Sequence, residues 1–453
     1  MSELITITPD RFKYLLETKQ NISNFNITEE VIINNETVFG SRSVTFTKCK
    51  FDFEFQLNGN FLHQKIYFIN CTFEQRFLAT NLNLKNLQFL NCKFNQYFTS
   101  RNMDAKLLTF ELCVFNLQKE LLIDQFKAEQ FNFVKNEFNR DIQLIPRSVG
   151  LISLAGGESN STLTLSNRGN KNTIDKLFIE FNSNHKTDFL LRNLSVNYFQ
   201  VHGELKDATF SMNDIKLKTG IFKYFSNQGN ILLNSIYPQS KTSIIVLKGV
   251  NLGRAIISST NFSLFDKIQI SNSNLVDIVP VNVEWCDSKV MKSANSLSDR
   301  KETYRQLKIV AEKNSDVSMK LLFHKYEMRA YLKILKVQKG KTSDKFILRL
   351  NQISNNHGLN WFRAFCWLLG LSILWYTFVK YNLKQTEFAP ELIGSEIGRF
   401  ISFINPIHQF DKVFYVDQDL LVNNALLFDG ISRITSAYLI YQFISAFRKY
   451  SKK

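Results

Sequence analysis

Four cysteines recur at matching places in the first half of the chain, and thiols in a regular pattern can bind a metal ion. They are Cys49, Cys71, Cys92 and Cys113. Zinc-binding thiolates converge on one point, usually as Cys-x-x-Cys pairs or together with histidine, and neither arrangement accompanies these cysteines. The alternative is a small apolar side chain that stacks on itself inside the fold, as buried free cysteine commonly does. We therefore predict a structural ladder, with no metal and no cofactor.

Histidine and acidic side chains form no catalytic pattern in the sequence. The chain contains no G-x-S-x-G, H-E-x-x-H or P-loop motif. His324 and Glu327 are three residues apart on a predicted helix, a spacing that indicates a solvated pair. His408 follows Asn405 and Pro406, so we expect it to cap or kink a helix within a loop. The sequence therefore predicts a protein that is not an enzyme.

The cysteines belong to a longer repeat, which predicts the elements that position them. The phrase Phe-x-x-Cys-x-Phe occurs four times, and a fifth copy carries Asn136 in place of cysteine. The copies are Phe46–Phe51, Phe68–Phe73, Phe89–Phe94, Phe110–Phe115 and Phe133–Phe138. A period of 21 to 23 residues indicates stacked supersecondary units, and short aromatic runs turned by asparagine favour strands. We predict a right-handed parallel β-helix with one copy per coil.

The repeat is weak in residues 144–244. After them the same spacing returns with other apolar residues in place of phenylalanine and other small residues in place of cysteine. The later copies are Leu247-Val250-Leu252, Ile257-Thr260-Phe262 and Ile270-Ser273-Leu275. Their local sequences, such as TNFSL and SNLVD, resemble pentapeptide-repeat proteins, which carry Leu or Phe after Asn or Asp. The resemblance implies a pentapeptide-repeat-like, four-sided β-helix, here over 40–295. We expect roughly ten coils at about 4.8 Å each, and a capping helix within 1–22 whose N-cap is Thr8.

Near Ser296 the sequence loses its strand pattern and becomes helical. Residues 296–357 are rich in Lys, Arg, Glu and Leu and predict two or three helices, the first with Ser298 as its N-cap. We expect breaks near Asn314 and Gly340. Lys and Arg outnumber Asp and Glu in this stretch, so we interpret it as a basic helical linker.

Residues 358–453 are predicted to form a membrane region with two spans. The first, 361–380, contains an uncharged core of 16 residues from Ala364 to Val379. A span requires roughly 20 apolar residues, with some tolerance for shorter ones. Its tryptophans fit an aromatic belt at the membrane interfaces. The alternative, a buried core helix, is disfavoured because nothing around the segment could enclose it.

The predicted second span, 425–447, carries two charges, Asp429 and Arg433, four residues apart. It could cross the bilayer or lie flat on it as an amphipathic helix. Lys and Arg are abundant before the first span and in the tail after the second, and scarce in the loop 384–424, which we expect to be interfacial. This asymmetry favours a transmembrane helical hairpin with both termini in the cytoplasm.

The net charge of +16 is concentrated beside the predicted membrane region rather than along the β-helix. A basic segment next to a span is typical of binding to anionic lipids of the inner leaflet, to which each nearby Lys or Arg contributes about 1 kcal/mol. We therefore expect an anionic bilayer as the partner of this segment, and not nucleic acid.

Several stretches of the last third are similar to a membrane-anchored group of pentapeptide-repeat proteins from bacteria of the Bacteroidetes type. They are YRQLKIVAEKNSD (304–316), FHKYEMRAY (323–331), SNNHGLNWFR (354–363), FINPIH (403–408) and YQFISAFRKY (441–450). The resemblance implies a protein of the bacterial inner membrane with a cytoplasmic β-helix. It implies little about activity.

Two functions from different classes stay open. One is a non-enzymatic, membrane-tethered platform whose β-helix binds an unidentified protein partner. The other is an oligomeric pore or channel-like effector, as in antiviral defence, that the β-helix gates. Asp429 and Arg433 are the candidate functional residues of the membrane region, because charges inside a span are commonly functional. The sequence leaves open whether the chain forms a homo-oligomer.

Overall fold

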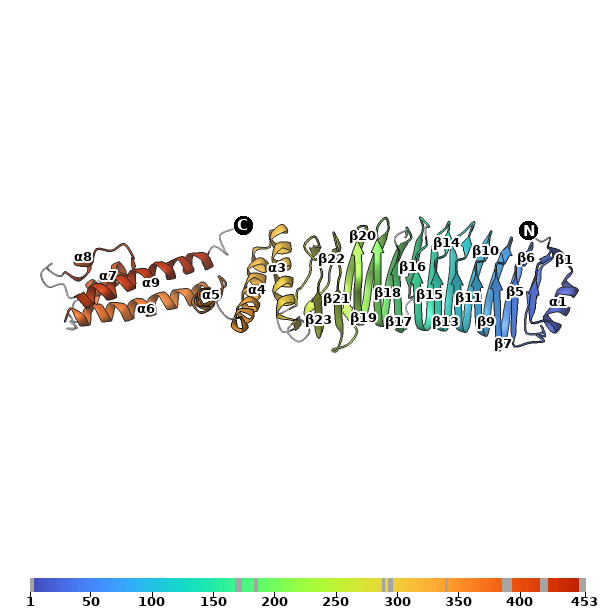
Figure 1. The fold of residues 1–453 in the computed structure, drawn as a ribbon, viewed down its shortest axis with the longest axis horizontal. Coiled ribbons are helices and arrows are strands. Elements are labelled where there is room, and N and C mark those ends of the chain that lie inside the picture. Colours follow the sequence, from blue (N-terminus) through green and yellow to red (C-terminus); the bar gives the residue numbers. More distant parts are fainter. Residues whose placement is uncertain are drawn as a thin grey trace. The chain divides into compact units, whose positions relative to one another are not determined.

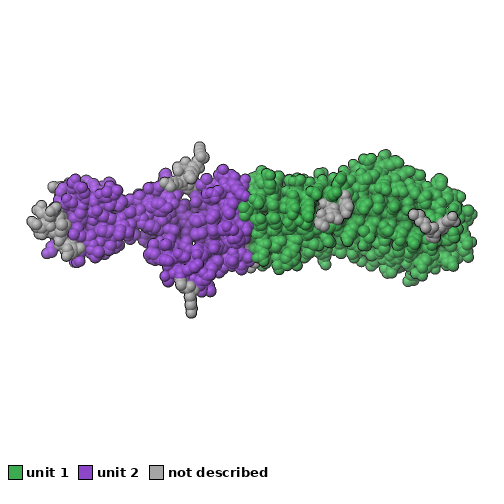
Figure 2. Space-filling view, turned by 45° about the horizontal axis from the view of Figure 1, so that its top comes forward, with its two compact units in different colours: residues 1–295 green, residues 296–453 purple. Residues whose placement is uncertain are grey.

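The structure is a computed structural model. It describes residues 4–157, 159–167, 173–182, 186–286, 290–291, 296–338, 341–384, 393–415 and 423–447. The chain divides into two compact units, Met1–Asn295 and Ser296–Lys453 (Figure 2). The first, the solenoid unit, is built mainly of strands, and the second, the helical unit, is built of helices (Figure 1).

The solenoid unit is a parallel β-solenoid of about 12 turns, in which strands of one turn pair with strands of the next (Figure 1). One sheet contains short strands in the order β1 (Ile5–Ile7), β3 (Phe25–Ile27), β6 (Lys50–Phe51), β8 (Thr72–Phe73), β10 (Lys93–Phe94), β12 (Val114–Phe115) and β14 (Glu137–Phe138). The remaining strands are β2 (Asn21–Ser23), β4 (Val31–Ile33), β5 (Ser43–Thr47), β7 (Phe55–Ile69), β9 (Arg76–Leu90), β11 (Tyr97–Glu111), β13 (Leu121–Val134), β15 (Ile142–Ala155), β16 (Thr162–Ser166), β17 (Thr173–Phe181), β18 (Asp188–Leu205), β19 (Thr209–Asn227), β20 (Asn230–Pro238), β21 (Ile244–Lys248), β22 (Ile256–Ser258), β23 (Lys267–Ser271) and β24 (Val279–Val281). The predicted parallel β-helix is confirmed.

The phenylalanines of the repeat lie above one another in successive turns. Phe46 pairs in register with Phe68, and Phe68 pairs with Phe89. The rings of Phe68 and Phe89 stack with centroids 5.1 Å apart and an interplanar angle of 5°. The second phenylalanine of each copy forms another column, which contains Phe51, Phe73, Phe94 and Phe115. In this half one repeat is therefore one coil, because residues one period apart occupy the same place in adjacent turns.

The stretch with the faint repeat continues the solenoid with aliphatic residues in place of phenylalanine. In the pair β18–β19, Leu194 stacks on Ile215 and Val196 on Leu217, and all four side chains are buried. These turns bring the total to about 12, where the repeat alone predicts roughly ten. The number of turns predicted from the sequence was too low, because a turn needs only inward apolar residues and not a repeated sequence motif.

The later repeat copies are arranged differently from the earlier ones. Leu247 pairs with Ile270, whereas Ile257 pairs with Leu233 and Pro280 in a separate column. Successive copies therefore alternate between two faces, and each turn here contains two copies. One copy per coil, predicted for the earlier copies, does not extend to this half, because its copies follow one another at about half of the earlier period.

The first helix, α1 (Pro9–Thr18), has Thr8 as its N-cap. The ring of Phe12 on this helix stacks on that of Phe46 with centroids 5.8 Å apart, so α1 covers apolar side chains of the first turns. Parallel pairing starts before residue 40, where we expected the β-helix to begin, because β2 already pairs with β5.

The helical unit contains α3 (Leu297–Lys313), α4 (Val317–Val337), α5 (Thr342–Asn355), α6 (Trp361–Asn382), α7 (Ile393–Ile404), α8 (Phe410–Phe414) and α9 (Asn423–Phe447). The N-cap of α3 is Ser296 and not Ser298, because the Ser296 hydroxyl accepts a hydrogen bond from the Asp299 backbone amide at 3.0 Å. The predicted break at Asn314 is the C-cap of α3. Gly340 lies outside the described residues.

Helices α3 and α4 pack as a pair through an ion pair as well as apolar side chains. Glu327 on α4 is 5% exposed, and its carboxylate lies 2.7 Å from the ammonium of Lys308 on α3. The His324 ring, three residues away on the same helix, lies farther from the carboxylate, at 3.8 Å. His324 and Glu327 therefore form the predicted pair, but Glu327 is buried rather than solvated, because Lys308 from another helix also contacts it.

Candidate functional site

The four ladder cysteines are buried at one corner of successive turns. Each follows a residue with a positive φ angle, such as Asn91 at 52°, where the chain turns out of its strand. The Cys92 thiol donates hydrogen bonds to the carbonyl oxygens of Phe68, 3.3 Å away in the preceding turn, and of Leu90, at 3.5 Å. Burial, followed by the neighbouring Cys113 and Cys71 thiols, raises the pKa of Cys92. A thiol in this state is a poor nucleophile, because the thiolate is the reactive form.

The same corner position accepts other small side chains that donate hydrogen bonds. Asn136 donates to the Phe110 carbonyl at 3.0 Å and accepts from the Cys113 amide at 2.8 Å. Thr260 and Ser273 in the later turns also donate to backbone carbonyls. The position therefore accepts small side chains, most of which donate a hydrogen bond, although Val250 occupies it in one later copy without a donor. Among the described residues no group of three or more His, Cys, Asp or Glu side chains could hold a metal ion.

The helical unit contains an antiparallel pair formed by α6 and α9. Near one end the rings of Trp361 and Phe447 lie 5.8 Å apart, and near the other end those of Phe378 and Phe428 lie 5.4 Å apart. In the described part of the chain α6 is the single helix that is long and apolar enough to cross a membrane. Only 22% of its most apolar stretch is buried, so the remainder faces outward. The core helix of a soluble protein would be mostly enclosed.

The buried residues of these two helices, called the seam here, are largely small or polar. From α6 it contains Ala364, Leu368, Ser372 and Val379, and from α9 it contains Ala425, Asp429, Ser432, Ser436, Leu439, Gln442 and Ala446. Large apolar side chains point away from the seam, among them Phe362, Ile373, Leu374, Leu427, Ile434 and Ile444. Small residues inside and large apolar residues outside are the reverse of a water-soluble bundle and typical of packed membrane helices.

A buried polar cluster lies where the loop between α7 and α8 meets α9. Asp429 is 3% exposed. One of its carboxylate oxygens lies 2.8 Å from His408 Nε2, and the other accepts a hydrogen bond from Arg433 Nε at 2.7 Å. His408 Nδ1 lies 2.7 Å from the carbonyl oxygen of Asn405. Both ring nitrogens of His408 therefore face oxygen atoms, one from the backbone and one from the Asp429 carboxylate.

The structure brings together the two charges predicted from the sequence and adds a third residue. Asp429 and Arg433 form the expected pair one helical turn apart. His408, which we expected to cap or kink a helix, does lie in a turn closed by Asn405, but its side chain reaches α9. No spacing in the sequence connects His408 with Asp429. The sequence offers one indirect signal for a third residue. Arg433 satisfies one oxygen of the Asp429 carboxylate, and the other oxygen needs a partner of its own if the carboxylate is buried.

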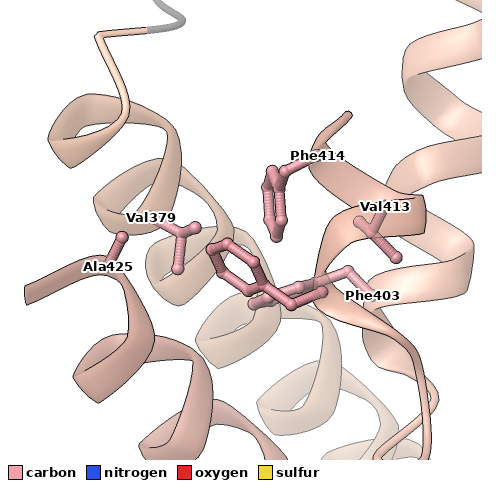
Figure 3. Close-up of a cluster of buried hydrophobic side chains, with 6 residues drawn as sticks. Val379, Phe403, Val413, Phe414 and Ala425 are labelled. Carbon is pink, nitrogen blue, oxygen red and sulfur yellow. The ribbon is translucent and has the colours of Figure 1, made fainter. Parts of the chain in front are cut away.

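An apolar cluster closes the loop end of the helix pair (Figure 3). It consists of Val379 from α6, Phe403 from α7, Phe410, Val413 and Phe414 from α8, and Ala425 from α9. Glu396 of α7 also accepts a hydrogen bond from Lys380 of α6 at 2.9 Å. On its other side α7 exposes Ile393, Ile397 and Ile401, which are spaced one turn apart. The loop is therefore packed onto the helix pair and presents an apolar stripe outward.

A second polar network joins α5 to the other end of α9. The amide of buried Asn355 donates to the backbone and side-chain oxygens of Gln442 at 3.2 and 2.5 Å. Asn351 accepts hydrogen bonds from Gln442 and from Tyr438, both at 3.1 Å. These contacts hold α5 crosswise to α6 and α9 (Figure 1).

Comparisons with known protein families, with curated proteins and with solved structures found no match to this chain. The described residues therefore define its class by themselves, as a parallel β-solenoid followed by a helical unit in which one of the described helices is long and apolar enough to span a membrane.

Proposed function

We propose that the protein is a membrane-tethered β-solenoid that acts as a non-enzymatic platform for another protein. The observation that carries the proposal is the inverted packing of α6 and α9, with small and polar residues inside and large apolar residues outside. Helix α6 has 22 residues, and at about 1.5 Å per residue it is long enough for a hydrocarbon core of about 30 Å.

In this proposal α9 is the second arm of a transmembrane hairpin. Its charges would oppose insertion if they faced lipid, but Asp429 points into the seam and is paired with both Arg433 and His408. Internal pairing lowers the cost of a charge in the bilayer. The basic helices α3 to α5 and the loop poor in Lys and Arg support an orientation with both termini in the cytoplasm, as in a bacterial inner membrane.

The solenoid would be the binding surface of this platform. Stacked turns form a long rigid face whose outward side chains vary from turn to turn, and repeat proteins commonly use such faces to bind partners. The outward residues of β7 to β13 are mainly polar, as expected of a surface in water. The partners in this proposal are an anionic bilayer and an unidentified protein.

The full chain should sediment with membranes and should resist extraction by carbonate and by high salt, because an inserted hairpin is held by apolar area and not by charge. A truncated chain that ends at Asn355 lacks α6 and α9, so it should stay in the supernatant and keep a β-rich circular dichroism spectrum. Release of the full chain by carbonate would contradict the tether.

Replacement of residues 364–379 by an unrelated apolar span separates a tether from a pore. A tether should keep partner binding after the exchange, and its induced expression should leave the membrane potential of the cells unchanged. A pore would depolarise cells, and the signal would disappear in Asp429→Ala. The measurement is a potential-sensitive dye in cells that express each form at equal level.

A further inference from the structure

A cluster of cationic side chains lies where α4 meets the turn between α5 and α6. Lys325 and Arg329 are one turn apart on α4. Nη2 of Arg329 donates a hydrogen bond to Oδ1 of Asn356 at 3.0 Å. The next residue, His357, is 6% exposed. Its Nε2 atom and the Nε atom of Arg329 are buried without a hydrogen-bond partner in the structure. Each of these unsatisfied polar atoms costs free energy, and the two residues are near enough for the charge of Arg329 to act on His357.

The charges around His357 are all positive. Burial first, and then the charges of His324, Arg329 and Lys325, lower the pKa of His357 to about 4. Burial and Arg329 likewise lower the pKa of Lys325. Among the described residues no carboxylate forms an ion pair with Lys325 or Arg329, because Glu327 on the same helix faces Lys308 and His324. The cluster is therefore an uncompensated positive site.

We propose that Lys325, Arg329 and His357 bind a phosphate group. A phosphate oxygen could accept hydrogen bonds from the free Arg329 Nε and from His357 Nε2, and the planar guanidinium suits phosphate well. The anion would also supply the negative charge that the site lacks. The group is either the headgroup of an anionic phospholipid or a free phosphate.

The surroundings favour the phospholipid, and this part of the inference rests on the proposed membrane tether. His357 lies four residues before Trp361, the first residue of α6, which places it at headgroup level if α6 spans the bilayer. Helix α5 exposes the apolar residues Phe346, Ile347 and Ile353 next to two further cations, Lys345 and Arg349. A basic amphipathic helix that runs crosswise to a span is suited to lie in the surface of an anionic leaflet.

Binding is tested on the full chain with two kinds of probe. Inorganic phosphate is titrated into detergent-solubilised protein by calorimetry, and lipid preference is measured by comparing thermal unfolding in nanodiscs of phosphatidylcholine with that in nanodiscs of equal parts phosphatidylcholine and phosphatidylglycerol. We expect Lys325→Gln and Arg329→Gln to weaken binding roughly tenfold or more, because each removes a charge-assisted contact. Lys333→Gln, an exposed lysine two turns after Lys325 on α4, is the matched control and should change nothing.

The titration of His357 gives an independent readout. Without an anion its ring should titrate near pH 4, and a bound phosphate should move that midpoint upward, because a negative neighbour favours the imidazolium. Nuclear magnetic resonance of histidine-labelled protein measures this midpoint, and His357→Gln identifies the signal.

Three outcomes are decisive. Selectivity for phosphatidylglycerol that is lost in Arg329→Gln but kept in Lys333→Gln supports the lipid site. Binding of inorganic phosphate alone, with the same variant pattern, supports a site for a free phosphate. The proposal is overturned if the protein shows neither lipid selectivity nor phosphate binding, or if Lys325→Gln and Lys333→Gln change binding equally. Carbonate extraction of the same proteins tests the tether separately, since the tether can fail while phosphate still binds.

Discussion

Cys92→Asp should unfold the turns on both sides of the substitution, with a loss of about 4 kcal/mol or more at neutral pH. Cys92 is fully buried, and its thiol lies against two carbonyl oxygens, which would repel a carboxylate. The donors near this position are weak or few, namely the neighbouring thiols and a single backbone amide of the kind that donates to Asn136. Burial of an ionised carboxyl without a donor shifts its pKa upward by about three to five units, and each unit corresponds to about 1.4 kcal/mol. Hydrogen exchange of the peptides that cover β8 to β13 should detect the opened turns, whereas β18 and β19 should stay protected.

Three companion variants test the reason for this loss. Cys92→Ala should cost only about 1–2 kcal/mol, as a small cavity, and Cys92→Ser should cost less than Ala because its hydroxyl keeps a donor. Asn91→Asp adds the same charge one residue earlier, at an exposed position, and should change stability little. If Cys92→Asp were tolerated as well as Cys92→Ala, the side chain would point outward and the register of the turns would need revision.

Asp429→Leu should destabilise the α6–α9 pair by about 3–5 kcal/mol, because it leaves Arg433 and His408 without their anion. Both side chains contact the Asp429 carboxylate, and the His408 side chain is 3% exposed. Three of the four tryptophans lie on α6, so their emission during unfolding in a denaturing detergent reports on this helix pair.

The double variant Asp429→Leu with Arg433→Leu should recover part of this loss. It removes the two opposite charges together and leaves only His408 without its partner, so the two substitutions should be strongly non-additive. Asp411→Leu removes a carboxylate from an exposed position on α8 and serves as the control, with little expected change. Equal effects of Asp429→Leu and Asp411→Leu would show that the buried cluster does not hold the hairpin together.

The sequence alone was sufficient wherever a structural feature repeats or is local. A period of 21 to 23 residues predicted the parallel solenoid, because stacking identical units brings equivalent residues into one column. The apolar run that begins at Trp361 predicted α6, and the spacing of Asp429 and Arg433 predicted their pairing one helical turn apart. Each of these depends on residues within one period or one turn of each other.

Only the tertiary structure decided the contacts between distant segments. Nothing in the spacing assigns His408 to Asp429, Lys308 to Glu327, or Asn355 to Gln442. The later repeat copies also alternate between two faces of the solenoid, which their amino-acid sequences alone do not reveal. Such contacts arise when helices and turns pack, and the packing selects one partner among many chemically equivalent side chains. For the same reason the cations around His357 became a candidate phosphate site only once α4 and the α5–α6 turn were placed together.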